Sequence, residues 1–177
     1  MVEGMRISKD RNVRIECLIA GENARELSGL KAWVLRRLGF ARDVRAELGV
    51  LIQRYGLEDQ VKLLGFVKDV RELYPMLDIL CFPSHLNAAG RPVFEAAFYS
   101  IPSVVAVADP VPDSIVHEVT GLAIPQPAPQ LIANALQRLV ENPTFCRQLG
   151  CQAKTWAEEI FTIETNAEQV RELYRKV

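Results

Sequence analysis

The chain has 177 residues and a formal net charge of −1 at pH 7, and 49% of its residues are hydrophobic. This length suffices for one α/β domain with a buried core, and the hydrophobic fraction excludes a disordered chain. The small net charge provides no general attraction to nucleic acid, so we expect no nucleic-acid partner. No apolar run approaches the roughly 20 residues that a membrane span requires, and the N-terminus lacks the apolar segment of a signal peptide.

Apolar runs alternate with amphipathic stretches along the whole chain. The first residues, MVEGMRISKDRN, resemble the end of a helix that leads into the first strand. Asp69 and Thr162 are positioned to cap the helices that follow them. The continuous apolar run at 78–84 predicts a strand that is buried on both faces. The predicted strands are 13–21, 61–67, 78–84, 102–108 and 121–125, and the predicted helices are roughly 29–55 with a break near Gly39, 70–77, 92–99, 129–141, 141–159 and 163–176.

This alternation predicts an α/β fold, in which a Rossmann-like, doubly wound parallel sheet is flanked by helices. We assign residues 1–177 to a single domain. In such folds the crossovers are right-handed, and ligands bind outside the carboxyl ends of the strands. Three loops therefore meet at one edge of the predicted sheet, after Val67, Ser84 and Ala108.

The cysteines and histidines do not have the spacing of a metal site. Cys17 and Cys81 lie inside predicted strands, and no two of the four cysteines form a CxxC pair. His85 and His117 are far apart in the sequence, and we expect His117 on a surface helix. We therefore expect no metal. Free thiols are typical of a reducing compartment, which favours a cytoplasmic protein.

A single carboxylate, Glu95, stands in an apolar helix start within the stretch LCFPSHLNAAGRPVFEAAFYSIPSVVAV. Pro92 fits the first turn of a helix, and the N–H groups ahead of it, near Ala89–Arg91, would attract anions and hydroxyls. A carboxylate one turn into the helix can accept two hydrogen bonds from a vicinal diol. The alternative is structural, because a Glu at the third helical position commonly completes a capping box.

Three stretches together suggest a family: VKLLGFVKDVRELYPMLDILCFPS, GRPVFEAAFYSIPSVVA and VTGLAIP. They resemble the C-terminal, donor-binding domain of GT-B retaining glycosyltransferases of family 4, also called glycosyl transferases group 1. The resemblance covers roughly residues 13–176 and is strongest over 61–124. It implies transfer of a hexose, such as mannose or glucose, from a nucleoside-diphosphate sugar to a glycan or lipid acceptor, as in polysaccharide biosynthesis. It implies front-face chemistry, with no cofactor and no metal.

The family signature is a Glu followed by Gly-Phe-Gly, then four further residues and a second Glu. By this resemblance Glu95 is the second acid, which holds the ribose hydroxyls, and Gly90 is the second glycine. Asn87 occupies the position of the first Glu and Ala88 that of the first glycine, so we assign no catalytic residue. The resemblance implies donor contacts from Ser84, Asn87, Ala89, Gly90, Arg91 and Glu95, nucleobase contacts from Phe66, Val67 and Lys68, and a phosphate loop with Pro112 and Asp113.

The sequence also departs from the family. Pro110 and Val111 replace a glycine pair near the diphosphate, and Asp113 has the alternative role of capping the next helix. We find neither the first strand, with its Arg and Lys, nor the N-terminal acceptor domain. We therefore expect this chain to be inactive alone and to require that domain as its partner. The face that would contact the missing domain is then exposed, and it could drive self-association. For the full-length protein, binding at the inner face of the membrane is an alternative location.

Two other functions remain open. A non-catalytic, degenerate GT-B domain with a regulatory or assembly role is favoured by Asn87, Ala88 and the replaced glycine pair. A sugar-nucleotide epimerase shares the architecture, but it needs an acid–base pair that Glu95 alone does not supply. A receiver domain is excluded, because IECLIAGEN lacks the clustered acids that such a domain carries at the end of its first strand.

Overall fold

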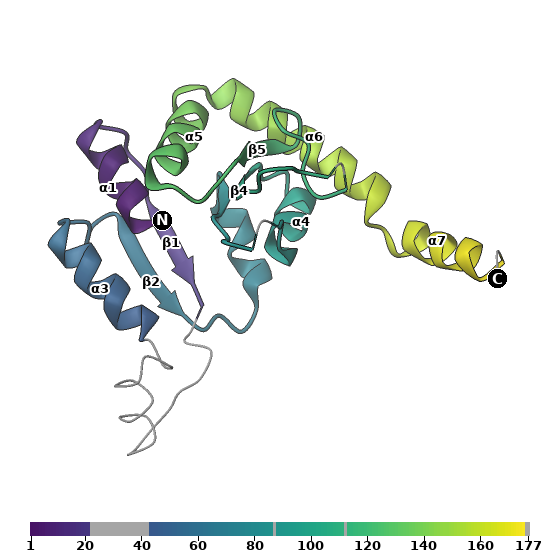
Figure 1. The fold of residues 1–177 in the computed structure, drawn as a ribbon, viewed down its shortest axis with the longest axis horizontal. Helices are drawn as coiled ribbons and strands as arrows, with labels where there is room; N and C mark the ends of the chain where they lie inside the picture. The colour runs from purple at the N-terminus through teal and green to yellow at the C-terminus, as the bar shows by residue number, and fades with distance from the viewer. Residues whose placement is uncertain (22–42, 87, 112, 176–177) are drawn as a thin grey trace, which may run out of the picture. The chain divides into compact units, whose positions relative to one another are not determined.

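A computed structural model of the chain describes residues 1–21, 43–86, 88–111 and 113–175, and divides them into two compact units. The N-terminal unit comprises residues 2–68, and the C-terminal unit comprises the residues from 69 onward together with Met1. Each unit contains parallel strands accompanied by helices (Figure 1), as the alternating sequence predicted. No helix in these described ranges is long and apolar enough to span a bilayer.

The N-terminal unit contains a two-stranded parallel sheet. Its strands pair from Cys17 opposite Val61 to Ala20 opposite Gly65, with an irregularity just before the last pair. The expected helix end before the first strand is confirmed, and its Met5 is almost fully buried. The elements are α1 (Val2–Asp10), β1 (Cys17–Ala20), α3 (Val44–Arg54) and β2 (Val61–Gly65). Helix α3 lies within the predicted helix over 29–55, and the part of that prediction before residue 43 lies outside the described residues.

The C-terminal unit contains a three-stranded parallel sheet in the order β3-β4-β5. Its elements are η1 (Val70–Glu72), η2 (Tyr74–Met76), β3 (Leu80–Phe82), α4 (Arg91–Phe98), β4 (Ser103–Ala106), β5 (Gly121–Ile124), α5 (Pro129–Glu141), α6 (Pro143–Ile160) and α7 (Ile163–Arg175).

The sheet of the C-terminal unit is most buried at its centre. Every residue of β4 is buried, because β4 lies between two partners. The prediction that the 78–84 run forms a doubly buried strand is wrong, since every residue of β3 is only half-buried. Among the described residues β3 lies at an edge of its sheet, and its apolar sequence alone could not reveal that place.

Polar side chains cap the starts of several helices by accepting hydrogen bonds from backbone N–H groups. The side chain of Thr162 accepts a hydrogen bond from Thr165 N at 3.1 Å, which confirms its predicted capping role. Asp69 accepts from Arg71 N at 3.0 Å, but two short 3₁₀ helices follow it instead of one helix over 70–77. Pro75 lies in the second of these and has no N–H to continue an α-helical ladder. The Arg71 side chain, by its hydrogen bond, lowers the pKa of Asp69 to about 2.

Helices α4 and α6 approach each other through small residues. A Cβ atom on Gly150 would lie 2.0 Å from the Ser100 carbonyl oxygen, just after α4. Ala97 of α4 packs with Ala153 and Ala157 of α6 in a buried cluster. The chain following α4 therefore lies against α6 with no side chain between the two backbones.

We predict that Gly150→Ala lowers the free energy of unfolding by about 1–3 kcal/mol, because the added methyl group would overlap the Ser100 carbonyl. Urea unfolding followed by circular dichroism measures the change. Gly49→Ala is the matched control, since a Cβ there meets no described atom within 4 Å and alanine favours the interior of α3 by about 0.5–1 kcal/mol. A Gly150→Ala variant as stable as the wild type would contradict the proposed close approach.

Candidate functional site

The start of α4 is fixed by a glycine against an aromatic ring. Gly90 is the N-cap residue, and Pro92 is the second residue of the helix, as predicted. A Cβ atom on Gly90 would lie 2.4 Å from Cζ of Phe82, at the end of β3. No side chain caps this helix start. The loop between β3 and α4 is thereby held close to the carboxyl end of the strand.

The Glu95 carboxylate is held by two different partners. The Tyr74 hydroxyl donates to Oε2 at 2.6 Å, and Nε of Arg91 lies 3.1 Å from Oε1. The Glu95 side chain is 33% exposed, whereas that of Arg91 is 85% exposed. The capping-box alternative is wrong, because Glu95 is the fifth residue of α4 and these contacts are to a phenol and a guanidinium. The carboxylate lies at the boundary between core and solvent.

Tyr74 is a buried partner with a fixed ring. It is 4% exposed and packs with Ala96 and Ile101. Its ring stacks on that of Tyr99 with the centroids 5.1 Å apart. Burial, with a further contribution from the hydrogen bond to Glu95, raises the pKa of Tyr74 well above its ordinary value. The hydroxyl therefore stays protonated and donates throughout the physiological pH range.

The other described donor residues predicted between β3 and α4 lie close to Glu95 in the chain. The Ser84 side chain is half-buried and accepts a hydrogen bond from Leu86 N at 3.1 Å. Ala89 packs against a buried cluster that includes Val93 and Val105. Ser84, Ala89, Gly90, Arg91 and Glu95 thus all belong to the C-terminal unit, while Asn87 lies outside the described residues.

The predicted nucleobase residues follow β2 in the N-terminal unit. Phe66 is 68% exposed, Val67 is half-buried and Lys68 is exposed. Their role in binding a base stays a prediction, as do the roles of the donor residues.

The predicted phosphate loop is a series of turns. Asp113 is exposed, and no helix follows it, so the alternative of a helix cap is wrong. His117 likewise lies outside any helix, because it forms an isolated parallel β-bridge with Gly121 and its Nδ1 accepts a hydrogen bond from Ala123 N at 3.0 Å. Hydrogen bonds such as this one hold the segment between β4 and β5 in its non-helical form. The sequence contained no local signal for these bonds. Pro112 lies outside the described residues.

Sequence reasoning missed Tyr74. It lies 21 residues before Glu95, in a segment expected to form an ordinary short helix. The available signal was a tyrosine flanked directly by the apolar residues Leu73 and Pro75, because a buried phenol usually finds a hydrogen-bond partner. Only the tertiary structure shows that this partner is the candidate ribose-binding carboxylate.

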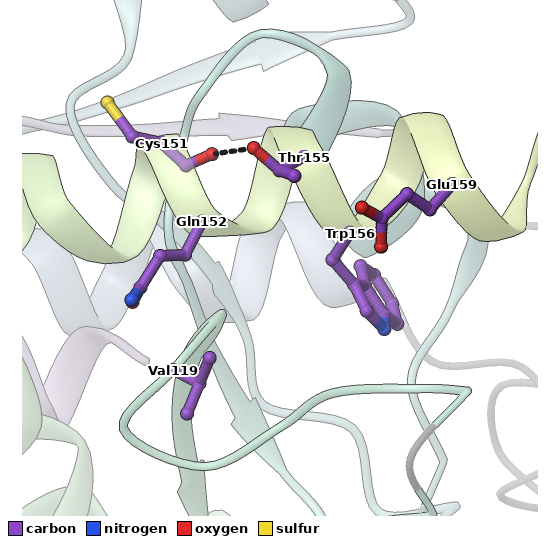
Figure 2. Close-up of a pocket in the computed structure, with 6 residues that line it drawn as sticks. All are labelled: Val119, Cys151, Gln152, Thr155, Trp156 and Glu159. Atoms are coloured by element: carbon purple, nitrogen blue, oxygen red, sulfur yellow. Dashed lines mark hydrogen bonds between the residues drawn. The ribbon is translucent and has the colours of Figure 1, made fainter.

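A separate open groove of about 330 Å³ lies on α6 (Figure 2). The Thr155 hydroxyl in it donates to the carbonyl of Cys151 at 3.3 Å, a contact within the helix. None of the residues lining the groove belongs to the predicted donor site, so it does not bear on the role of Glu95. The lining residues are Val119, Cys151, Gln152, Thr155, Trp156 and Glu159.

Comparison with known proteins identifies the family. The sequence model described as glycosyl transferases group 1 matches residues 1–156. The chain belongs to this family. It is 27% identical over 139 residues to D-inositol 3-phosphate glycosyltransferase of Kineococcus radiotolerans, covering 73% of this chain and 32% of that protein. The chain therefore spans about a third of the length of the curated relatives it matches.

Solved structures confirm the predicted fold class. Anabaena HepE in complex with UDP superposes with a TM-score of 0.72 and 21% identity, covering 99% of this chain and 53% of that one. The C-terminal domain of a glycosyl transferase group 1 protein, LpcC from Francisella tularensis, superposes with a TM-score of 0.63 and 19% identity. The match covers 91% of this chain and 93% of that domain. The chain thus has the Rossmann-like fold of GT-B proteins.

We predict that Tyr74→Phe changes how stability depends on pH. The folded-state pKa of Tyr74 lies above the unfolded-state value of about 10, so the stabilisation is complete below that pH and is lost as pH rises above it. The variant should be about 1 kcal/mol less stable at pH 8, and this deficit should shrink toward pH 11. Urea titrations across that range measure it. Tyr99→Phe, which leaves the Tyr74–Glu95 bond in place, should show no such convergence, and a constant deficit for Tyr74→Phe would contradict the prediction.

Proposed function

We propose that the chain is the donor-binding part of a retaining, family 4 glycosyltransferase that transfers a hexose, such as mannose or glucose, from a nucleoside-diphosphate sugar to a glycan or lipid acceptor. The observation that supports this most directly is the partly exposed carboxylate of Glu95 on α4, a helix that begins against the carboxyl end of β3, in a chain of the glycosyl transferases group 1 family. Two solved structures of one similar protein support a nucleotide donor, because Anabaena HepE has been crystallised in complex with UDP and with UDP-glucose.

Glu95 can bind a ribose diol without losing its buried partner. An ionised carboxylate has room for about four hydrogen bonds on its two oxygens. Oε2 is held by Tyr74, while Oε1 faces Arg91, whose side chain is largely in solvent. An exposed ion pair of this kind contributes little free energy. Two charge-assisted hydrogen bonds from a vicinal diol could therefore replace it, and the released guanidinium would be available to a phosphate.

The proposed chemistry needs no protein nucleophile, metal or cofactor in this chain. In the front-face route the acceptor attacks on the side from which the nucleotide leaves, and we assign no catalytic residue. The chain spans about a third of its relatives, so transfer would require the acceptor-binding half of the fold as a partner. We therefore expect the chain alone to bind the donor but not to catalyse transfer. We expect the protein to lie in the cytoplasm, or at the inner face of the membrane when it is full-length.

Isothermal titration with UDP, GDP and ADP, each beside its 2′,3′-dideoxy analogue, tests the proposal. We predict that one ribonucleotide binds and that Glu95→Gln weakens it at least about tenfold, because the neutral amide loses charge-assisted hydrogen bonds to the diol. The dideoxy analogue should bind both proteins equally.

Glu164→Gln, an exposed change in the first turn of α7, is the matched control and should bind like the wild type. Equal ribonucleotide affinities for the wild type and Glu95→Gln would contradict ribose recognition by this carboxylate.

A non-catalytic role in regulation or assembly is the second candidate. Pro110 and Val111 stand where the family has its glycine pair, and the Val111 carbonyl accepts hydrogen bonds from the backbone and side chain of Ser114. This loop forms its own turn and lacks the glycines that would let a diphosphate approach the backbone closely. Failure of every nucleotide in the panel to bind the wild type would favour this candidate.

A further inference from the structure

We propose that Tyr74 is a positioning residue that fixes the Glu95 carboxylate in the orientation needed to receive the ribose diol. This inference rests on the proposed function and adds to it a residue from a different part of the chain. Tyr74 belongs to η2, before β3, and is separated from Glu95 by 21 positions.

The first argument is the rigidity of the phenol. Tyr74 is 4% exposed, its ring stacks on Tyr99 at 5.1 Å, and it packs with Ala96 and Ile101. Ala96 directly follows Glu95 in α4, so the same helix that carries the carboxylate also supports the ring. The hydroxyl is thereby held at a fixed point relative to the backbone of Glu95.

The second argument is the asymmetry of the two contacts. Tyr74 binds Oε2 from the core, whereas Arg91 approaches Oε1 from solvent with its side chain 85% exposed. A ligand can displace Arg91, but a buried phenol held on several sides stays in place. The carboxylate then keeps one oxygen bound to the protein and presents the other to the ligand.

The third argument is conformational entropy. A glutamate side chain has several rotatable bonds, and ordering such a side chain on binding weakens affinity. The short hydrogen bond from Tyr74 restricts those bonds before any ligand arrives. Removing the hydroxyl should therefore weaken the binding of a diol, even though Tyr74 itself does not touch the ligand.

A double-mutant cycle tests the proposal: the wild type, Tyr74→Phe, Glu95→Gln and the double variant are titrated with UDP, GDP and ADP and with their 2′,3′-dideoxy analogues. We expect Tyr74→Phe to weaken the ribonucleotide that binds by about three- to tenfold and to leave the dideoxy analogue unchanged. In the Glu95→Gln background it should cause no further loss, because the group it positions is already gone. Tyr99→Phe, which removes a hydroxyl from the same ring stack, should bind like the wild type.

The outcomes separate this proposal from the proposed function. If the wild type prefers a ribonucleotide to its dideoxy analogue and Tyr74→Phe keeps the full preference, the positioning role is wrong while ribose recognition stands. Equal weakening of both ligand types, or the same loss in the Glu95→Gln background, would assign Tyr74 a structural role only and would also overturn the proposal. If no nucleotide binds the wild type, the proposed function and this inference are both wrong.

Discussion

At each end of α4 a glycine allows a close backbone contact that a side chain would prevent. Before the helix, Gly90 lies against the ring of Phe82, and after it the Ser100 carbonyl lies against Gly150 of α6. Neither contact leaves room for a methyl group, and protein interiors are packed too densely to yield such room cheaply. These contacts fix α4 relative to β3 and α6. They therefore also fix the position of the carboxylate that α4 carries.

Glu95 occupies a place between two unfavourable extremes. A fully buried carboxylate would need compensation for its desolvation, and a fully exposed one would have no fixed direction. Here the Tyr74 hydroxyl supplies a fixed hydrogen bond from the core, and Arg91 supplies a weak, solvent-exposed ion pair. The combination gives the carboxylate a defined orientation together with a partner that a ligand can replace. Under the proposed function, this is what allows one oxygen to be stationary while the other binds a diol.

The family pattern is kept unevenly along the chain. Gly90 and Glu95 match the family's second glycine and second acid, which under the proposed function would approach and hold the ribose. By the resemblance to the family, Asn87 stands where an acid would contact the transferred sugar, and Pro110 and Val111 stand where glycines would lie near the diphosphate. We infer that the ribose end of a donor would be recognised largely as in the family, whereas the sugar and diphosphate would depend on other contacts.

The sequence by itself determined the elements whose signals are local. Alternating apolar and amphipathic runs predicted every described strand, and Thr162 marked the start of α7, because burial periodicity and capping act over only a few residues. The spacing of one short motif also selected Gly90 and Glu95 as candidate donor-binding residues, a role that stays a prediction. The tertiary structure decided which strand is central, because pairing partners come from distant parts of the chain. It also decided that the Glu95 carboxylate binds Tyr74 and Arg91 and does not cap its own helix. The contact with Tyr74 joins residues 21 positions apart that only packing brings together, so no local pattern could contain it.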